Sequence, residues 1–395
     1  MRSEWTKKKL SDIADFNPRE TIKKGAVAKK ISMDVLRPFY RDIPYYVEEC
    51  FSGGTKFRNG DTIMARITPC LENGKTAQVS ILNDGEVGFG STEYIVFRAK
   101  EGIANKDYLY YLVCSPEVRE PAIKSMIGSS GRQRVQTDVV KNLEIDVPPL
   151  VDQEKIGSFL KSFDDKNALN DKINKNLEEQ LSALFVNMFG HSIDSLDNSD
   201  IKLGDLIESV DNRGKTPPLS DEPTDYPIID VRALSGNSRI IDYTNCTKYV
   251  SKETYNNWFR SGHPKEYDIL ISTVGSLAEM KIFLGTIGCI AQNVVGFRTK
   301  GISPLYLYQY LNYIKNDLVA YNIGSVQPSI KVTHIIKHSI YVASKEDIEI
   351  FDSIARNITK KIFANCQENE ALKQMRDILL PKLMSGELDV SNIKI

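Results

Sequence analysis

The sequence predicts an α+β fold in which two globular halves of mixed α/β structure are joined by two long antiparallel helices that form a coiled coil. Two observations support this prediction. Segments of the first half return in the same order about 195 residues later, and each copy closes with a long stretch of heptad-spaced apolar residues. Solenoid units repeat every roughly 20 to 50 residues, so this much longer repeat indicates two related domains with a pseudo-twofold relation.

The composition is that of an ordinary globular protein. Hydrophobic residues make up 41% of the 395 residues and charged residues 26%, which is typical of chains that bury apolar cores. The formal charge of -1 neither indicates nor excludes a local basic surface. None of the six cysteines forms a CxxC pair, and no apolar run reaches the roughly 18 residues of a membrane span. Because no signal peptide is evident, the sequence predicts a cytoplasmic protein with reduced thiols and no membrane contact.

The duplication can be followed through the whole chain. The matching segments keep their order, and insertions move the offset between 193 and 207 residues. They are "KLSDI" (9–13) with "KLGDL" (202–206), "GDTIM" (60–64) with "YDILI" (267–271), "YLYYL" (108–112) with "YLYQYL" (306–311), "IGS" (127–129 and 323–325), and "TDVVK" (137–141) with "THIIK" (333–337).

Each copy is predicted to begin with strands and to end with helices. Runs of β-branched residues interrupted by glycine favour strands and turns, and aromatic-rich stretches near 106–126 and 303–321 favour helices. The prolines of "VPPL" (147–150) favour extended backbone before the first long helix. We therefore expect the first globular half at 1–150, the first long helix at 151–190, the second globular half at 191–343 and the second long helix at 344–390.

Both long helices carry an asparagine where the heptad pattern favours an apolar residue. The first series reads Ile156, Phe163, Asn170, Leu177 and Leu184, and the second repeats it 195 residues later with Asn365 at its centre. If the helices pair antiparallel about their midpoints, Asn170 and Asn365 meet. We expect them to fix the helix register, because any slip would bury an unpaired amide. The alternative is that Asn170 faces solvent on a loosely amphipathic helix.

The ends of the long helices carry the resemblance to a known family. Together with the duplication, "VPPLVDQEKI" (147–156) and above all "LLPKLMSGEL" (379–388) make the chain resemble the specificity subunit of type I restriction-modification systems. The second helix departs from the first because it begins in "VASKEDIEI" (342–350), without the proline pair and without a counterpart of Gln153. Pro381 is expected to kink or end this helix.

The resemblance implies a phage-defence protein that carries out no chemistry and holds no cofactor. Each globular half would be a target recognition domain that reads one part of an asymmetric, bipartite site in double-stranded DNA. The helices would set the unread spacer between the half-sites. They would also dock two DNA adenine methyltransferase subunits, and translocating restriction subunits would join the same complex.

Candidate DNA contacts follow from residue type and context. Arginine and lysine suit guanine edges, asparagine and glutamine suit adenine edges, and basic or hydroxyl side chains suit phosphates. For each candidate, a solvated loop residue is the alternative interpretation. The candidates are Arg66, Asn73, Lys75, Arg132, Gln133 and Arg134 in the first half, and Arg213, Lys215, Thr216, Arg239, Lys281, Gln292, Asn293 and Gln327 in the second.

Catalytic motifs are not apparent in the sequence. The turns "PCLENGKT" (69–76) and "SVDNRGKT" (209–216) resemble phosphate-binding loops but have Pro69 and Ser209 where the first glycine is needed. His334 and His338 have the spacing of two helical zinc ligands, yet no third ligand lies near them in the sequence. We therefore predict neither a catalytic residue nor a metal site.

Three other functions stay open at this stage. The chain could be a coiled-coil adaptor whose globular halves bind proteins, or a self-contained nuclease or methyltransferase, which the missing motifs disfavour. It could also be the recognition subunit of a related restriction system that cuts on both sides of its site. In the repeat alignment "GRQR" (131–134) stands opposite "SVQP" (325–328), which predicts that the two half-sites differ.

Overall fold

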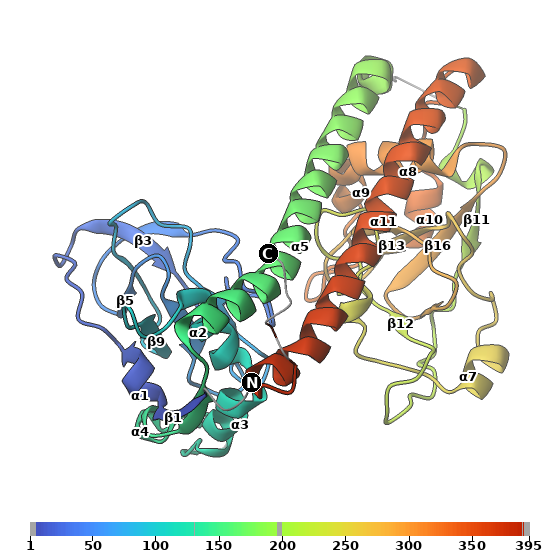
Figure 1. The fold of residues 1–395 in the computed structure, drawn as a ribbon. Coiled ribbons are helices and arrows are strands. Elements are labelled where there is room, and N and C mark those ends of the chain that lie inside the picture. The colour runs from blue at the N-terminus through green and yellow to red at the C-terminus, as the bar shows by residue number, and fades with distance from the viewer. Residues whose placement is uncertain (1–4, 130, 196–199, 389, 391–395) are drawn as a thin grey trace. The chain divides into compact units, whose positions relative to one another are not determined.

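A computed structural model describes residues 5–129, 131–195, 200–388 and 390. The chain divides into two compact units, one formed by residues 1–169 with 369–395 and the other by residues 170–368. Each unit therefore contains one globular half together with a part of each long helix (Figure 1). No helix among the described residues is long and apolar enough to span a membrane.

The first unit is built on two four-stranded sheets. One has the order β2-β9-β6-β7, and the other has the order β4-β3-β8-β5 with β3 and β8 parallel; a separate antiparallel pair joins β1 to β10. The strands are β1 Thr6–Lys9, β2 Ala14–Phe16, β3 Val27–Ile31, β4 Val47–Cys50, β5 Thr55–Phe57, β6 Thr62–Ala65, β7 Thr76–Gln78, β8 Gly88–Gly90, β9 Tyr94–Ala99 and β10 Glu144–Val147.

The second unit repeats this plan with a smaller second sheet. Its four-stranded sheet has the order β11-β16-β13-β14, and β12 pairs in parallel with β15 as β3 does with β8. The strands are β11 Ile207–Val210, β12 Ile228–Ile229, β13 Ile269–Ser272, β14 Met280–Ile282, β15 Cys289–Ile290 and β16 Val294–Thr299. The predicted α+β fold with an internal repeat is thus confirmed.

Two side-chain interactions recur at equivalent points of the two units. The backbone N–H groups of Lys9 and Lys202 donate to Asp12 and Asp205, at 2.9 and 2.8 Å. Buried carboxylates on the loops before β6 and β13 pair with arginines of β9 and β16: the Asp61–Arg98 and Asp268–Arg298 distances are both 2.7 Å. We call these two pairs the framework ion pairs, because they tie the inner strands together in each unit.

Helix α2 packs against the four-stranded sheet of the first unit, and α8 packs against that of the second unit. Asn105 and Ser303 cap the aromatic-rich helices α2 and α8, since each side chain accepts two backbone hydrogen bonds from the first turn. Their tyrosines and leucines form the main cores with the strands. The helices are α1 Leu10–Ile13, α2 Lys106–Cys114, α3 Pro116–Lys124, α4 Thr137–Lys141, α6 His191–Asp194, α7 Lys252–Asn257, α8 Pro304–Tyr313, α9 Lys315–Ala320 and α10 Val332–Ile336.

The two long helices are α5 (Leu150–Phe185) and α11 (Lys345–Met384). They run side by side in the second unit (Figure 1). There Tyr306 and Tyr310 of α8 pack against Phe185 of α5, and Phe185 packs against Phe351 of α11. A π-helical turn, Val186–Gly190, continues α5.

The two long helices begin in different ways. At the start of α5 the buried Gln153 accepts from the Asn105 N–H at 3.0 Å and donates to the carbonyls of Pro148 and Ile103. At the start of α11, Ser344 accepts from the Asp347 N–H at 3.1 Å and serves as the cap. A hydroxyl cap therefore replaces the proline and glutamine junction in the second copy.

The second helix does not end at Pro381, so that part of the expectation is wrong. Helix α11 continues through Pro381 to Met384, and the Ser385 N–H still donates to the Pro381 carbonyl at 3.0 Å. A proline removes only the hydrogen bond of its own nitrogen, and this loss falls in the last turns of the helix.

Removing the arginine from either framework ion pair is expected to destabilise the chain. Arg98→Met and Arg298→Met each leave a buried carboxylate without its charged donor, which should lower the free energy of unfolding by about 2–3 kcal/mol. Urea denaturation of the full chain measures this loss. The control is Lys124→Met, whose ion pair with Glu120 is exposed on both sides and should contribute less than about 1 kcal/mol. An equal loss in all three variants would contradict the prediction.

Candidate nucleic-acid interface

In the first unit, two loops that are far apart in the sequence are hydrogen-bonded to each other. The Thr68 N–H donates to the Gln133 carbonyl and the Gln133 N–H donates to the Thr68 hydroxyl, both at 3.0 Å. The Val135 N–H donates to the Arg66 carbonyl at 2.8 Å. The candidates from the loop after β6 and those from the loop before α4 therefore belong to one surface.

Glu93 lies between two of the candidate arginines. Its carboxylate is 2.7 Å from Arg134 Nη2 and 3.8 Å from Arg66 Nε. The hydrogen bonds from Arg134 hold the pKa of Glu93 below its ordinary value, so the carboxylate stays charged at neutral pH. Both guanidinium groups are partly exposed. A ligand that binds them has to share them with this carboxylate.

The remaining candidates of the first unit differ in exposure. Arg132 and Asn73 are exposed, whereas Lys75 is half-buried and donates its Nζ to the Met33 carbonyl at 2.8 Å. Lys75 therefore ties the loop after β6 to the end of β3. Arg132 and Asn73 are the better candidates for contact with a ligand.

In the second unit, the corresponding surface forms around the end of β13. The Thr273 N–H donates to the Asn293 carbonyl at 2.8 Å, and the Gly275 N–H donates to the Pro328 carbonyl at 3.0 Å. The second bond joins the loop after β13 to the loop before α10, as the Thr68–Gln133 bonds do in the first unit. The structure thus places Asn293 and Gln327 near each other.

Two further candidates are joined by their side chains. Gln292 Nε2 donates to the Thr216 hydroxyl at 2.8 Å, which brings the "GKT" turn to the end of β15. Gln292 has φ +43°, a left-handed conformation that costs energy for any residue other than glycine. Lys215 is exposed, and Arg213 is paired with Asp211 at 2.7 Å.

The prediction that Arg239 and Lys281 contact DNA is wrong, because both side chains are buried inside the second unit. Arg239 is bound to Glu178 of α5, with 2.6 Å between Nη2 and Oε2. Lys281 donates its Nζ to the carbonyls of Gly236 and Ser238, and burial lowers its pKa to about 8. The sequence could not reveal that these side chains are buried, because the local pattern around a basic residue is the same whether it faces water or a buried carboxylate.

The sequence reasoning missed three apolar residues on the same loops. Ile127 and Ile323, the first residues of the repeated "IGS" segment, are 61% and 52% exposed, and Val326 at the tip of the second loop is 97% exposed. The signal was present in the repeat. An apolar residue kept at an exposed position in both copies deserves to be tested as a contact.

The asparagines of the long helices are buried, so the alternative of a solvent-facing Asn170 is wrong. The expected meeting of Asn170 with Asn365 is also wrong. Asn365 Nδ2 donates to Asn174 Oδ1 at 2.7 Å, and Asn170 Nδ2 donates to Glu368 Oε2 at 2.8 Å. The antiparallel register is displaced by one helical turn from the midpoint estimate, because the packing of side chains sets it and the helix lengths do not.

The structure offers no cluster of three potential metal ligands within the described ranges. His338 Nδ1 lies 2.8 Å from the Tyr321 hydroxyl, and the His334 ring lies beside the Tyr321 ring. These two histidines therefore pack around a tyrosine.

The buried amide pair of the helices can be tested with a double-mutant cycle. Asn365→Leu alone should lower the free energy of unfolding by about 1–3 kcal/mol, because it leaves the buried Asn174 oxygen without its donor. The double variant Asn174→Leu/Asn365→Leu should recover that loss and melt at or above the wild-type temperature, at the expense of a unique register. Thermal melting and light scattering measure both effects.

The control for this cycle is Asn176→Leu, which changes an exposed asparagine of the same helix and should leave melting nearly unchanged. A double variant less stable than either single variant would show that the amides do not act as a pair.

Comparisons with known proteins also find two copies of one domain in the chain. The model of the type I restriction modification DNA specificity domain matches residues 2–179 and again residues 196–374. The type I restriction enzyme EcoAI specificity subunit of Escherichia coli is 42% identical over 104 residues, which are 26% of this chain and only 18% of that relative.

Two other similarities extend over nearly the whole chain. The type I restriction enzyme HindI specificity subunit of Haemophilus influenzae is 23% identical, over 98% of this chain and 100% of the relative. The crystal structure of the type I restriction-modification system S subunit from M. genitalium has a TM-score of 0.54 at 15% identity and covers 96% of each chain. At that identity the structural match shows the fold alone.

Proposed function

The chain belongs to the family of type I restriction-modification DNA specificity domains, and from this premise we propose that it reads an asymmetric, bipartite DNA site with one half-site for each globular half. It is a non-catalytic specificity subunit, and the chemistry of modification and cleavage lies with other subunits.

The single observation that supports a bipartite site is a repeated framework with different tips. In both units a hydrogen bond joins the loop after an inner strand to the loop before a short helix, as Thr68–Gln133 and as Gly275–Pro328. The tips carried by these loops differ, with Arg132 and Arg134 in one unit and Val326 and Gln327 in the other. Different side chains on equivalent supports would read different bases.

Under this proposal the candidate residues divide into base readers, phosphate contacts, arginines already paired with carboxylates, and residues that support a loop. Arg132, Asn73, Gln133, Gln292 and Gln327 are the proposed base readers, because their side chains suit base edges. Lys215 and Thr216 suit phosphates, which position the protein without reading sequence. Arg66, Arg134 and Arg213 are already paired with carboxylates and would engage DNA by exchanging those partners. Lys75 and Asn293 support their loops instead. Lys75 donates to the Met33 carbonyl, and the Asn293 backbone carbonyl accepts from the Thr273 N–H.

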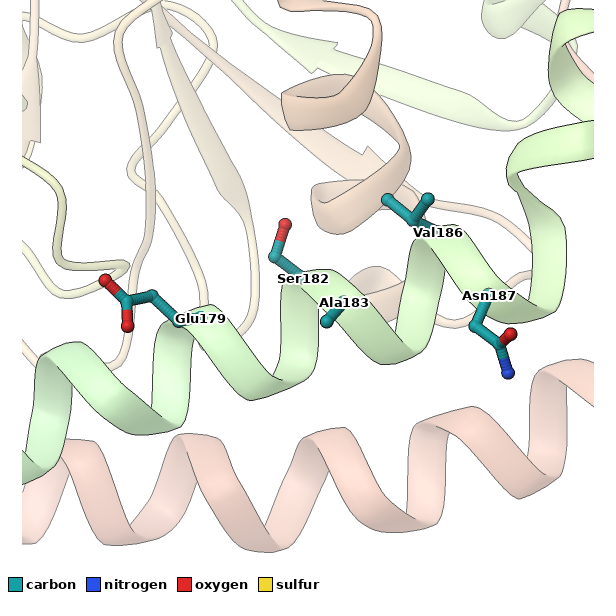
Figure 2. Close-up of a pocket in the computed structure, with 5 residues that line it drawn as sticks. All are labelled: Glu179, Ser182, Ala183, Val186 and Asn187. Carbon is teal, nitrogen blue, oxygen red and sulfur yellow. The ribbon is translucent and has the colours of Figure 1, made fainter.

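The exposed faces of the long helices are the proposed docking sites for methyltransferase subunits. In the second unit α11 exposes Ile350 and Ile354, one turn apart, at 50% and 40%. Helix α5 and the π-helical turn that continues it line an open pocket there. Figure 2 shows its lining residues Glu179, Ser182, Ala183, Val186 and Asn187. In the first unit α11 exposes Met375 and Ile378. Small and apolar residues on solvent-facing helix surfaces suit protein partners.

The test of the proposed function is a methylome. The chain is co-expressed with a cognate methyltransferase subunit in a strain that lacks such systems, and native DNA is sequenced with modified-base detection. We expect a new split motif, different in its two parts, that carries methyladenine. No new methylation from soluble, associated proteins would contradict the proposal and would favour an adaptor that binds other proteins.

Substitutions in one unit are expected to affect only one half of the site. Arg132→Ala/Gln133→Ala should relax the base preference in one half-site, and Lys215→Ala/Gln327→Ala should act on the other. Each lost base contact should cost about 1–3 kcal/mol of binding, and each lost phosphate contact should reduce the salt dependence of binding. The methylated motif and the affinity at several salt concentrations measure these effects. A variant that relaxed both halves alike would contradict the assignment of one half-site to each unit.

The docking surface has its own test. Ile350→Glu/Ile354→Glu should weaken co-purification of the methyltransferase subunit while leaving the melting temperature of the isolated chain unchanged, since both side chains are exposed. Lys360→Glu is the matched control, because it adds a similar charge on an adjacent exposed face of the same helix. Equal loss with the control would indicate a general charge effect.

A further inference from the structure

A loop of the second globular half is anchored in the helix pair by a buried charge. Arg239, whose side chain is fully buried, donates from Nε and Nη2 to both oxygens of Glu178 on α5 at 2.6–3.0 Å. Its backbone N–H donates to Glu178 Oε1 at 2.8 Å. Nη1 reaches across to the Thr359 hydroxyl of α11 at 3.0 Å. One arginine thus binds both long helices, and we call Arg239, Glu178 and Thr359 the helix anchor.

The loop that carries Arg239 is itself fixed to the sheet. Lys281 of β14 donates to the carbonyls of Gly236 and Ser238, and the Ile282 N–H donates to the Arg239 carbonyl at 2.8 Å. The Arg239 guanidinium also lies over the Tyr308 ring of α8, with 5.4 Å between the Arg239 Cζ and the ring centroid. The anchor therefore connects a rigid part of the globular half to the helices, with every partner supplied by the second unit.

The first unit uses the equivalent helix position in a different way. Asp164 of α5 stands 195 residues before Thr359 in the repeat. It accepts from Arg376 of α11 at 2.6 Å and from the Tyr111 hydroxyl at 2.6 Å. The first globular half supplies the Tyr111 hydroxyl, and it also supplies the buried Arg41, which pairs with Asp165 of α5 at 3.2 Å. In both units an arginine of the globular half thus pairs with a carboxylate of α5, but at different helix positions.

This difference contrasts with the framework ion pairs. Asp61–Arg98 and Asp268–Arg298 keep the same residues and the same 2.7 Å spacing in both units. The framework ion pairs are thus repeated at equivalent positions, whereas Arg41 and Arg239 pair with helix residues that are not equivalent in the repeat. Removing either partner of a buried charge pair is costly, so such pairs are well suited to enforce one arrangement.

We propose that Arg239, acting through Glu178 and Thr359, is a positioning residue that fixes the position of the second globular half on the helix pair. We call this position the seat. The first half has its own arginine contact with α5, Arg41–Asp165, at a different helix position. As a consequence for recognition, which rests on the proposed function, the anchor sets the spacer length that the protein accepts. One base pair changes the position of a half-site by about 3.4 Å and about a tenth of a helical turn, so a loose seat would tolerate neighbouring spacer lengths.

The first experiment tests the seat itself in the isolated full chain. Arg239→Met/Glu178→Met removes both charges and replaces them with apolar groups, so that neither charge is left buried alone. Hydrogen exchange of the backbone at residues 234–242 should accelerate by about tenfold or more, because charge-assisted hydrogen bonds hold this loop on the helices. The control is Arg298→Met/Asp268→Asn, which removes a framework ion pair and should leave exchange at 234–242 close to that of the wild type.

The second experiment tests the consequence in the complex with the methyltransferase subunit. For the double anchor variant we expect methylation to spread to sites with a spacer one base pair longer or shorter, with both half-site sequences unchanged. The framework control should lower the melting temperature and keep a single spacer length. A purely stabilising role of Arg239 would change melting alone.

The outcomes separate the two proposals. A wild-type chain that yields no split motif would overturn the proposed function, and the exchange experiment would still decide whether Arg239 fixes the seat. A wild-type split motif, together with wild-type exchange and a single spacer length in the anchor variant, would overturn the inference about Arg239.

Discussion

Polar groups buried in the contact between α5 and α11 are the constraint on which the rest of the structure depends. Leucine pairs alone would let two antiparallel helices slide by a turn with little change in energy, whereas a buried amide loses its partner at once. The Asn365–Asn174 bond and the Asp164–Arg376 ion pair each specify one register within their unit. The register in turn determines where the globular elements that contact both helices lie along them.

The globular halves show how one framework can be used for two purposes. The strand order of the four-stranded sheet, the backbone hydrogen bonds to Asp12 and Asp205, and the framework ion pairs are the same in both units. The loops that emerge from this framework differ in length and charge. A fixed support with variable tips allows the side chains at the tips to change without disturbing the core, because the tips contribute little to the buried surface.

The sequence predicted the fold better than it predicted the site, for reasons that particular residues make clear. Matches such as "KLSDI" with "KLGDL" reflect local hydrogen bonds and core positions. The repeat preserves both, so the two copies can be aligned from the sequence. Arg239 and Lys281 were misassigned because their partners Glu178 and Gly236 are distant in the sequence or belong to the backbone. The meeting of Asn170 with Asn365 failed by one turn because the seam pattern gives the apolar face of each helix and leaves the offset between helices open. Glu93 was overlooked because an acidic residue near arginines has no distinctive local pattern.

Glu93 has a consequence for how the protein would search DNA. Its carboxylate occupies Arg134 and lies near Arg66 in the free chain, so it imitates the anionic groups that a duplex offers everywhere. In the proposed complex, a phosphate of random duplex would have to displace Glu93 from these arginines, so part of the free energy of the new contact would be lost. A matching site adds base acceptors that the carboxylate cannot imitate. An internal competitor of this kind would shorten the time spent on wrong sequences, because the arginines would leave Glu93 only where base contacts add to the phosphate contacts.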